Sequence, residues 1–103
     1  MKPIIIISTY PNKKSITKIA NDLVQNNIIA CVNIIKISSI YSWQGKIENA
    51  SEYLALFKTT QKNKKSLKEK IKATHPYEIP EIAEINITSI NKSYLNWLVE
   101  STS

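Results

Sequence analysis

The segment THPYEIPE, residues 74–81, gathers side chains that bind metal ions or move protons. It holds His75, the only histidine of the chain, together with Glu78 and Glu81. Its two prolines favour an extended path with three residues per turn, which places these side chains along one edge, about 9 Å between successive members. At that spacing the imidazole and one carboxylate can reach a common ion, whereas copper and zinc normally take three or four ligands. The segment therefore predicts a divalent-metal site of His75, Glu78 and Glu81 that takes further ligands from elsewhere, a second copy of the chain being the obvious source.

The same segment also suits a purely structural role. Two prolines make a rigid connection from a helix to a strand, and such a connection needs polar side chains. In that interpretation His75 hydrogen-bonds a backbone carbonyl and Glu81 pairs with a lysine. Both interpretations stay open at the level of sequence.

The chain has only one glycine, one cysteine and one histidine, and this scarcity excludes many known kinds of site. Gly45 alone cannot build a P-loop or a dinucleotide-binding turn, and Cys31 alone permits neither an internal disulfide nor a C-x-x-C motif. One histidine excludes the H-E-x-x-H site of metalloproteases. His75 with a glutamate is an acid–base pair in principle, but no nucleophile with an activating base is visible. We therefore expect a protein that is not an enzyme.

The net charge of +6 comes from fourteen basic residues, all lysines, seven of which lie between Lys58 and Lys72. Lysine lacks the bidentate fork with which arginine reads guanine, and no aromatic residues interleave with these lysines as a stacking platform would require. The run predicts a solvated helix face and no nucleic-acid partner. Apolar runs reach only four to five residues and no leader segment is visible, so we expect no membrane association and a cytoplasmic location.

Apolar periodicity predicts the elements that position these residues. Strands are expected at 2–10, 28–43, 46–60 and 83–88, and helices at 12–27, 61–73 and 91–101, with Gln44 and Gly45 forming a hairpin turn. The isoleucine run of the first strand indicates burial on both faces. This βαββαβ order with a C-terminal helix predicts an α+β, ferredoxin-like antiparallel sheet with two helices on one face, in a single domain of residues 1–103.

The central hairpin is expected to project from this body. Its arms are roughly a dozen residues each, against a mean strand of about 5–6. Four large apolar side chains lie near its tip, and leaving them in water costs roughly 1.5–3 kcal/mol each; they are Ile40, Tyr41, Trp43 and Ile47. We predict that they form an interface between copies of the chain, the alternative being a hairpin that folds back over its own sheet.

Five motifs, in this order, resemble the CutA family of divalent-cation-tolerance proteins: ACVNI (30–34), SIYSWQGKIE (39–48), FKTT (57–60), HPYEIPEI (75–82) and YLNWL (94–98). The resemblance covers nearly the whole chain. It implies a ferredoxin-like fold, a homotrimer assembled through the long hairpin and similar to the trimers of PII signalling proteins, and a part in the response to metal ions such as copper.

The resemblance also bears on the site. Copper ligands proposed in some members are a cysteine, a histidine and a glutamate, at positions that hold Ser8, Thr74 and Glu81 here. Hydroxyls bind copper poorly, so weak divalent-ion binding is expected, with no certain cofactor. An alternative is a PII-like signalling or scaffolding trimer that binds a small ligand or a protein in a cleft between subunits, lined by Tyr77, Tyr94 and Trp97.

Overall fold

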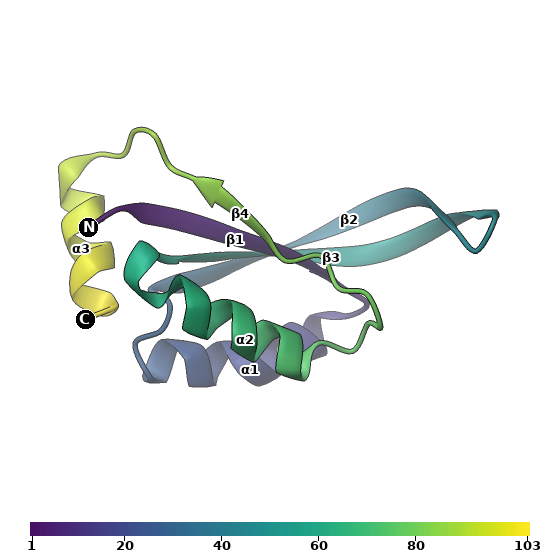
Figure 1. Cartoon of the computed structure of the whole chain (residues 1–103), viewed down its shortest axis with the longest axis horizontal. Helices are drawn as coiled ribbons and strands as arrows, with labels where there is room; N and C mark the ends of the chain where they lie inside the picture. The colour runs from purple at the N-terminus through teal and green to yellow at the C-terminus, as the bar shows by residue number, and fades with distance from the viewer.

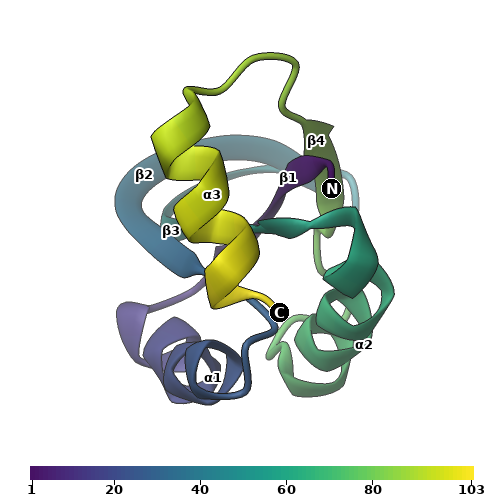
Figure 2. The ribbon, with the colours of Figure 1, turned by 90° about the vertical axis from the view of Figure 1, so that its left-hand side faces the viewer.

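The computed structural model describes residues 1–103 and has the predicted ferredoxin-like architecture. Its elements are β1 (Pro3–Tyr10), α1 (Lys13–Gln25), β2 (Cys31–Trp43), β3 (Lys46–Thr60), a short 3-10 turn at Gln61–Asn63, α2 (Lys64–Thr74), β4 (Ala83–Asn86) and α3 (Lys92–Ser101). The strands form one antiparallel sheet in the order β2-β3-β1-β4. Helices α1 and α2 cover one face, and α3 lies across the end opposite the hairpin tip (Figures 1 and 2). No helix is long and apolar enough to cross a membrane.

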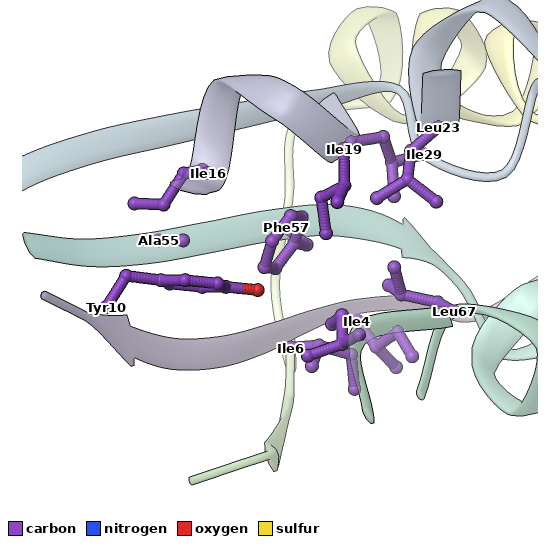
Figure 3. Close-up of a cluster of buried hydrophobic side chains, with 11 residues drawn as sticks. Ile4, Ile6, Tyr10, Ile16, Ile19, Leu23, Ile29, Ala55, Phe57 and Leu67 are labelled. Carbon is purple, nitrogen blue, oxygen red and sulfur yellow. The ribbon is translucent and has the colours of Figure 1, made fainter. Parts of the chain in front are cut away.

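The main core lies between the sheet and the two helices (Figure 3). Residues of β1 alternate strictly between buried and half-buried, so Ile4 and Ile6 are fully buried while Ile5 and Ile7 are not. The prediction that this strand is buried on both faces is therefore wrong. Its physical reason is that both helices pack on the same face, which leaves the isoleucines of the other face without a covering layer.

Helix α1 is capped by Asn12. The side chain of Asn12 accepts a hydrogen bond of 2.8 Å from the backbone N–H of Ser15, which satisfies a free amide of the first turn. The apolar face of α1 is buried from Ile16 to Leu23, but Val24 is 43% exposed. Leu23 takes the inward position of that turn, and its neighbour points about 100° away around the helix.

The hairpin is the longest feature of the molecule, whose axes measure 45 × 26 × 21 Å. Strands β2 and β3 pair from Cys31 opposite Lys58 to the turn. Both turn residues have positive φ, 50° at Gln44 and 78° at Gly45, which confirms the predicted turn. Strand β2 begins three residues later than predicted, because the N–H groups of residues 28 and 29 bond back to the last turn of α1.

The sheet face turned away from α1 and α2, called here the open face, is rich in aliphatic side chains. The pairing register places on it Ile5, Ile7, Ile35, Ile37, Leu54, Leu56 and Ile85. Ile35 and Ile85 are 48% and 46% exposed, and at the hairpin tip Ile40 and Ile47 are 73% and 70% exposed. A single chain therefore presents a large apolar surface to water.

Candidate functional site

His75 follows α2 directly, and its ring is fixed by one stacking contact and two hydrogen bonds. It stacks on Tyr10 with ring centroids 4.1 Å apart. The backbone N–H of Tyr77 donates to Nδ1 at 3.1 Å, so Nδ1 is unprotonated and Nε2–H donates to the carbonyl of Thr9 at 2.9 Å. Burial lowers the pKa of His75, although the bond to Thr9 opposes this effect. The ring is thus a neutral imidazole with both nitrogens engaged.

Tyr77 reaches across to the base of the hairpin. Its hydroxyl donates a hydrogen bond of 2.6 Å to Oε2 of Glu52 on β3. Burial, this hydrogen bond and the negative charge of Glu52 raise the pKa of Tyr77, so the phenol stays protonated. Glu52 is only 7% exposed. Most of the residue is therefore shielded from water, and Oε2 has a neutral donor beside it.

A cavity of about 290 Å³ lies next to this pair, where the hairpin leaves the sheet. It combines aromatic rings, carboxylates and one aliphatic side chain, and we call it the acidic cavity. Its lining residues are Thr9 of β1, Tyr41 and Trp43 of β2, Glu52 of β3, and Tyr77, Glu78, Ile79 and Glu81 of the segment after α2. The strand residues among them share the open face of the sheet.

The acidic cavity is lined by carboxylates and by no lysine, although the chain carries a net charge of +6. The only ion pairs of the structure join Glu84 of β4 to Lys64 and Lys68 of α2, at 3.4 and 3.0 Å. The hydrogen bond from Lys68 is the main reason that the pKa of Glu84 is lowered. The alternative in which Glu81 pairs with a lysine is therefore not realised.

The structure brings together part of the predicted site. Glu78, Glu81 and Tyr77 line the acidic cavity, whereas His75 lies beside it and turns both nitrogens to the backbone. No three histidine, cysteine, aspartate or glutamate side chains gather closely enough within one chain to hold a metal ion. A metal bound by these residues would therefore take its remaining ligands from water or from a second copy.

The other two predicted cleft residues lie elsewhere. Tyr94 and Trp97 belong to α3, at the end of the molecule opposite the hairpin tip (Figure 1), with ring centroids 5.3 Å apart. The ammonium of Lys58 lies 5.7 Å from the centroid of the Tyr94 ring, and the Tyr94 hydroxyl lies 3.9 Å from Sγ of Cys31. A cleft shared with Tyr77 can form only between copies of the chain.

Sequence reasoning missed Thr9, Glu52 and Ile79 as lining residues. Glu52 carried a usable signal, since a charged residue precedes the apolar run of residues 53–57 in the same strand. Thr9 and Ile79 carried none that we recognise. Tyr41 and Trp43, predicted as interface residues, prove also to line the acidic cavity.

Comparison with known proteins gives a consistent result. The sequence model of the CutA1 divalent ion tolerance protein family matches residues 4–101. The chain is 39% identical over 99 residues to the divalent-cation tolerance protein CutA of Pyrococcus horikoshii, covering 96% of this chain and 97% of that protein. It is 42% identical over 99 residues to the divalent-cation tolerance protein CutA of Thermus thermophilus, covering 95% and 96%.

Solved structures agree with this result. The structure of the periplasmic divalent cation tolerance protein CutA from Archaeoglobus fulgidus superposes with a TM-score of 0.93 at 34% identity, covering 98% of this chain and 99% of that chain. The similarity therefore extends over the whole fold, the hairpin and α3 included.

Proposed function

This chain belongs to the CutA1 divalent ion tolerance family, and from that premise we propose that it is a non-catalytic homotrimer that binds divalent metal ions, copper included, weakly and takes part in the response to them. The observation that carries the proposal is the acidic cavity. Glu52, Glu78 and Glu81 face it without a positively charged partner from the chain.

The chemistry of the cavity supports weak and unselective binding of divalent ions. Its donors are carboxylate oxygens, which suit hard cations, while copper(II) binds most tightly of the common divalent ions at nearly any oxygen or nitrogen site. Glu78 and Glu81 are exposed and can reach an ion at the cavity mouth. Weak binding follows because one chain supplies too few converging ligands. His75 joins such a site only by giving up one of its two hydrogen bonds.

The open face and the hairpin tip support assembly. The aliphatic open face of the sheet is unfavourable in water. So is the projecting hairpin, on which Ile40 and Ile47 are more than two-thirds exposed. Association of three copies would cover these surfaces, bring the hairpin of one copy against another, and supply the missing ligands. The free thiol of Cys31 suits a reducing compartment, and we propose a cytoplasmic location.

A second candidate function is the binding of a small molecule or protein segment in a PII-like trimer. Tyr41 and Trp43 are 43% and 39% exposed where they line the acidic cavity, and such half-exposed aromatic rings favour an organic ligand over a metal ion alone.

Isothermal titration with Cu²⁺, Zn²⁺ and Mg²⁺ tests the metal proposal. We expect affinity in the order Cu²⁺, Zn²⁺, Mg²⁺, and a loss of about tenfold or more when Glu78 and Glu81 are both changed to Gln, since tenfold corresponds to about 1.4 kcal/mol. The matched control changes Glu69 and Glu100 to Gln, which alters the net charge equally at exposed positions outside the cavity. Equal curves for the two double variants would remove the cavity from metal binding. Titration of His75→Ala separately decides whether the imidazole takes part.

A further inference from the structure

We propose that the outer surface of helices α1 and α2 docks an acidic protein segment, whose carboxylates pair with lysines of both helices and whose apolar side chains enter the groove between them. This inference goes beyond metal binding at the acidic cavity and does not depend on it. The two helices cover the face of the sheet opposite the open face (Figures 1 and 2). Assembly through the open face and the hairpin tip therefore leaves this surface accessible.

The distribution of charge is the first reason. Helix α1 carries three lysines and one aspartate, and α2 carries five lysines and one glutamate, so these two helices together hold the whole net charge of +6. The six lysines in the rest of the chain are matched by six glutamates. The positive charge of the molecule is thus concentrated on one side, where it attracts a negatively charged partner.

Most of this charge has no partner within the chain. Only Lys64 and Lys68 form ion pairs, both with Glu84. The other six lysines of the two helices are exposed and form no ion pair; they are Lys13, Lys14, Lys18, Lys65, Lys70 and Lys72. The structure joins the lysines of α1, which lie far away in the sequence, to those of α2 in one surface.

A groove of about 350 Å³ between the two helices gives this surface a shape. The helices lie side by side under the sheet (Figure 2). Lys18 of α1 and Lys70 of α2 both line the groove, together with the apolar side chains of Ile19, Leu23 and Ala73. The groove therefore combines a positive charge from each helix with an apolar lining. This combination matches a segment in which an aliphatic side chain lies between carboxylates.

The residue types favour a protein segment over a nucleic acid. Neither helix contains an arginine, which grips phosphates with two parallel hydrogen bonds, or an aromatic ring, on which a base would stack. Asp22 also lines the groove, and its negative charge interrupts the positive surface. A continuous row of phosphates would meet this carboxylate, whereas a peptide can place an uncharged residue beside it.

A membrane surface is also a poorer match. Helices that bind at a membrane interface insert an apolar face among the lipids. The apolar faces of α1 and α2 are already buried against the sheet, as the complete burial of Ile16 and Leu67 shows. Val24 is the only large apolar side chain of the two helices that is exposed.

Fluorescence anisotropy of a labelled peptide of repeated Glu-Glu-Leu units, titrated with the full chain, tests the inference. A salt concentration of about 0.1 M limits the Debye length to about 10 Å, so distant charges contribute little. We expect saturable binding of this peptide, weaker binding of a Glu-Glu-Ser repeat and none of a Gln-Gln-Leu repeat. Labelled oligothymidylate of equal charge and vesicles of phosphatidylglycerol are expected to bind more weakly than the Glu-Glu-Leu peptide.

A pair of matched double variants locates the binding surface. Changing Lys18 and Lys70 to Gln is expected to raise the Kd for the Glu-Glu-Leu peptide about threefold to tenfold, through loss of two surface ion pairs. Changing Lys2 and Lys92 to Gln removes the same charge at exposed positions outside α1 and α2, and is expected to leave the Kd unchanged.

A gain of affinity guards against a folding defect in the lysine variants. Asp22→Asn removes the negative charge that lines the groove and is expected to lower the Kd about twofold to threefold. Glu100→Gln makes the same change of charge at an exposed position of α3 and is expected to leave the Kd unchanged.

No saturable binding of the Glu-Glu-Leu peptide, or an equal rise of the Kd in the two lysine double variants, would overturn the inference. Tighter binding of oligothymidylate or of the vesicles would overturn it in favour of a nucleic acid or a membrane. None of these results changes the calorimetry with divalent ions on the Glu78 and Glu81 variants. The failure of this inference is thus distinguishable from a failure of the proposed metal binding.

Discussion

The hydroxyl of Tyr77 lies 2.6 Å from Oε2 of Glu52 and joins the segment after α2 to the base of the hairpin, 25 residues earlier in the chain. This hydrogen bond gives a largely buried carboxylate its only donor. It also fixes the aromatic wall of the acidic cavity against the sheet.

Tyr77→Phe is expected to lower the free energy of unfolding by about 1–3 kcal/mol, because it leaves the carboxylate of Glu52 without its donor. The control is Tyr10→Phe, which removes a buried hydroxyl that makes no hydrogen bond of good geometry, its nearest candidate being the hydroxyl of Ser8, and should change stability much less. Urea denaturation at one fixed protein concentration measures both. Equal effects of the two substitutions would show that the bond contributes nothing specific.

The pKa of His75 is lowered in the folded chain, so the unfolded chain takes up a proton at a higher pH than the folded one. Stability is therefore complete above the ordinary histidine pKa of about 6.5 and falls as the pH drops below it. Protonation of Nδ1 also breaks the hydrogen bond from the N–H of Tyr77. We expect the free energy of unfolding to decrease between about pH 7.5 and pH 5.5.

His75 is the only histidine, so a variant isolates this effect. His75→Gln should remove most of the pH dependence in that window while lowering stability at pH 7.5 through loss of the stacking on Tyr10. A pH slope that persists undiminished in His75→Gln would contradict the assignment.

The hairpin turn requires positive φ at two successive residues, of which only the second is glycine. Gly45→Ala should destabilise the chain by about 1–2 kcal/mol from backbone strain alone, because a Cβ there would meet no atom within 4 Å. Gln44→Asn should stabilise it by up to about 1 kcal/mol, since asparagine tolerates this conformation better. Thermal denaturation compares the Tm of the two variants. Changes in Tm of the same sign would contradict the prediction, because they would mean that positive φ at these two residues does not limit stability.

Lysines at the hairpin tip should prevent assembly without unfolding the chain. The double change Ile40→Lys and Ile47→Lys places charges at positions that are 73% and 70% exposed in one chain, so the fold should survive while the buried interface does not. Val24→Lys, at a position on α1 that is 43% exposed, is the control and should assemble normally. Sedimentation velocity distinguishes the two, and an unchanged sedimentation coefficient for the tip variant would remove the hairpin from the interface.

The fold could be predicted from the sequence because its signals are local. The spacing of Ile16, Ile19 and Leu23 marks the buried face of α1, and the lone Gly45 between two segments that favour strands marks the turn. The burial of β1 was mispredicted, since a run of isoleucines looks the same whether a second layer comes from the chain itself or from another copy.

The acidic cavity could be predicted only in part because it depends on long-range pairing. Glu78 and Glu81 stood out within one short segment, but Thr9 and Glu52 reach the cavity through the pairing of β3 with β1 and with β2. The hydrogen bond between His75 and the carbonyl of Thr9 spans 66 residues. No local pattern indicates that this imidazole is engaged on both nitrogens.

Multi-angle light scattering of the purified chain at micromolar concentration tests the central claim, that three copies cover the open face and the hairpin tip. We predict a single species with three times the chain mass of 11.7 kDa. A homogeneous particle of 11.7 kDa would contradict the account, because the aliphatic surface would then be stable in water and no ligand from a second copy could complete the metal site.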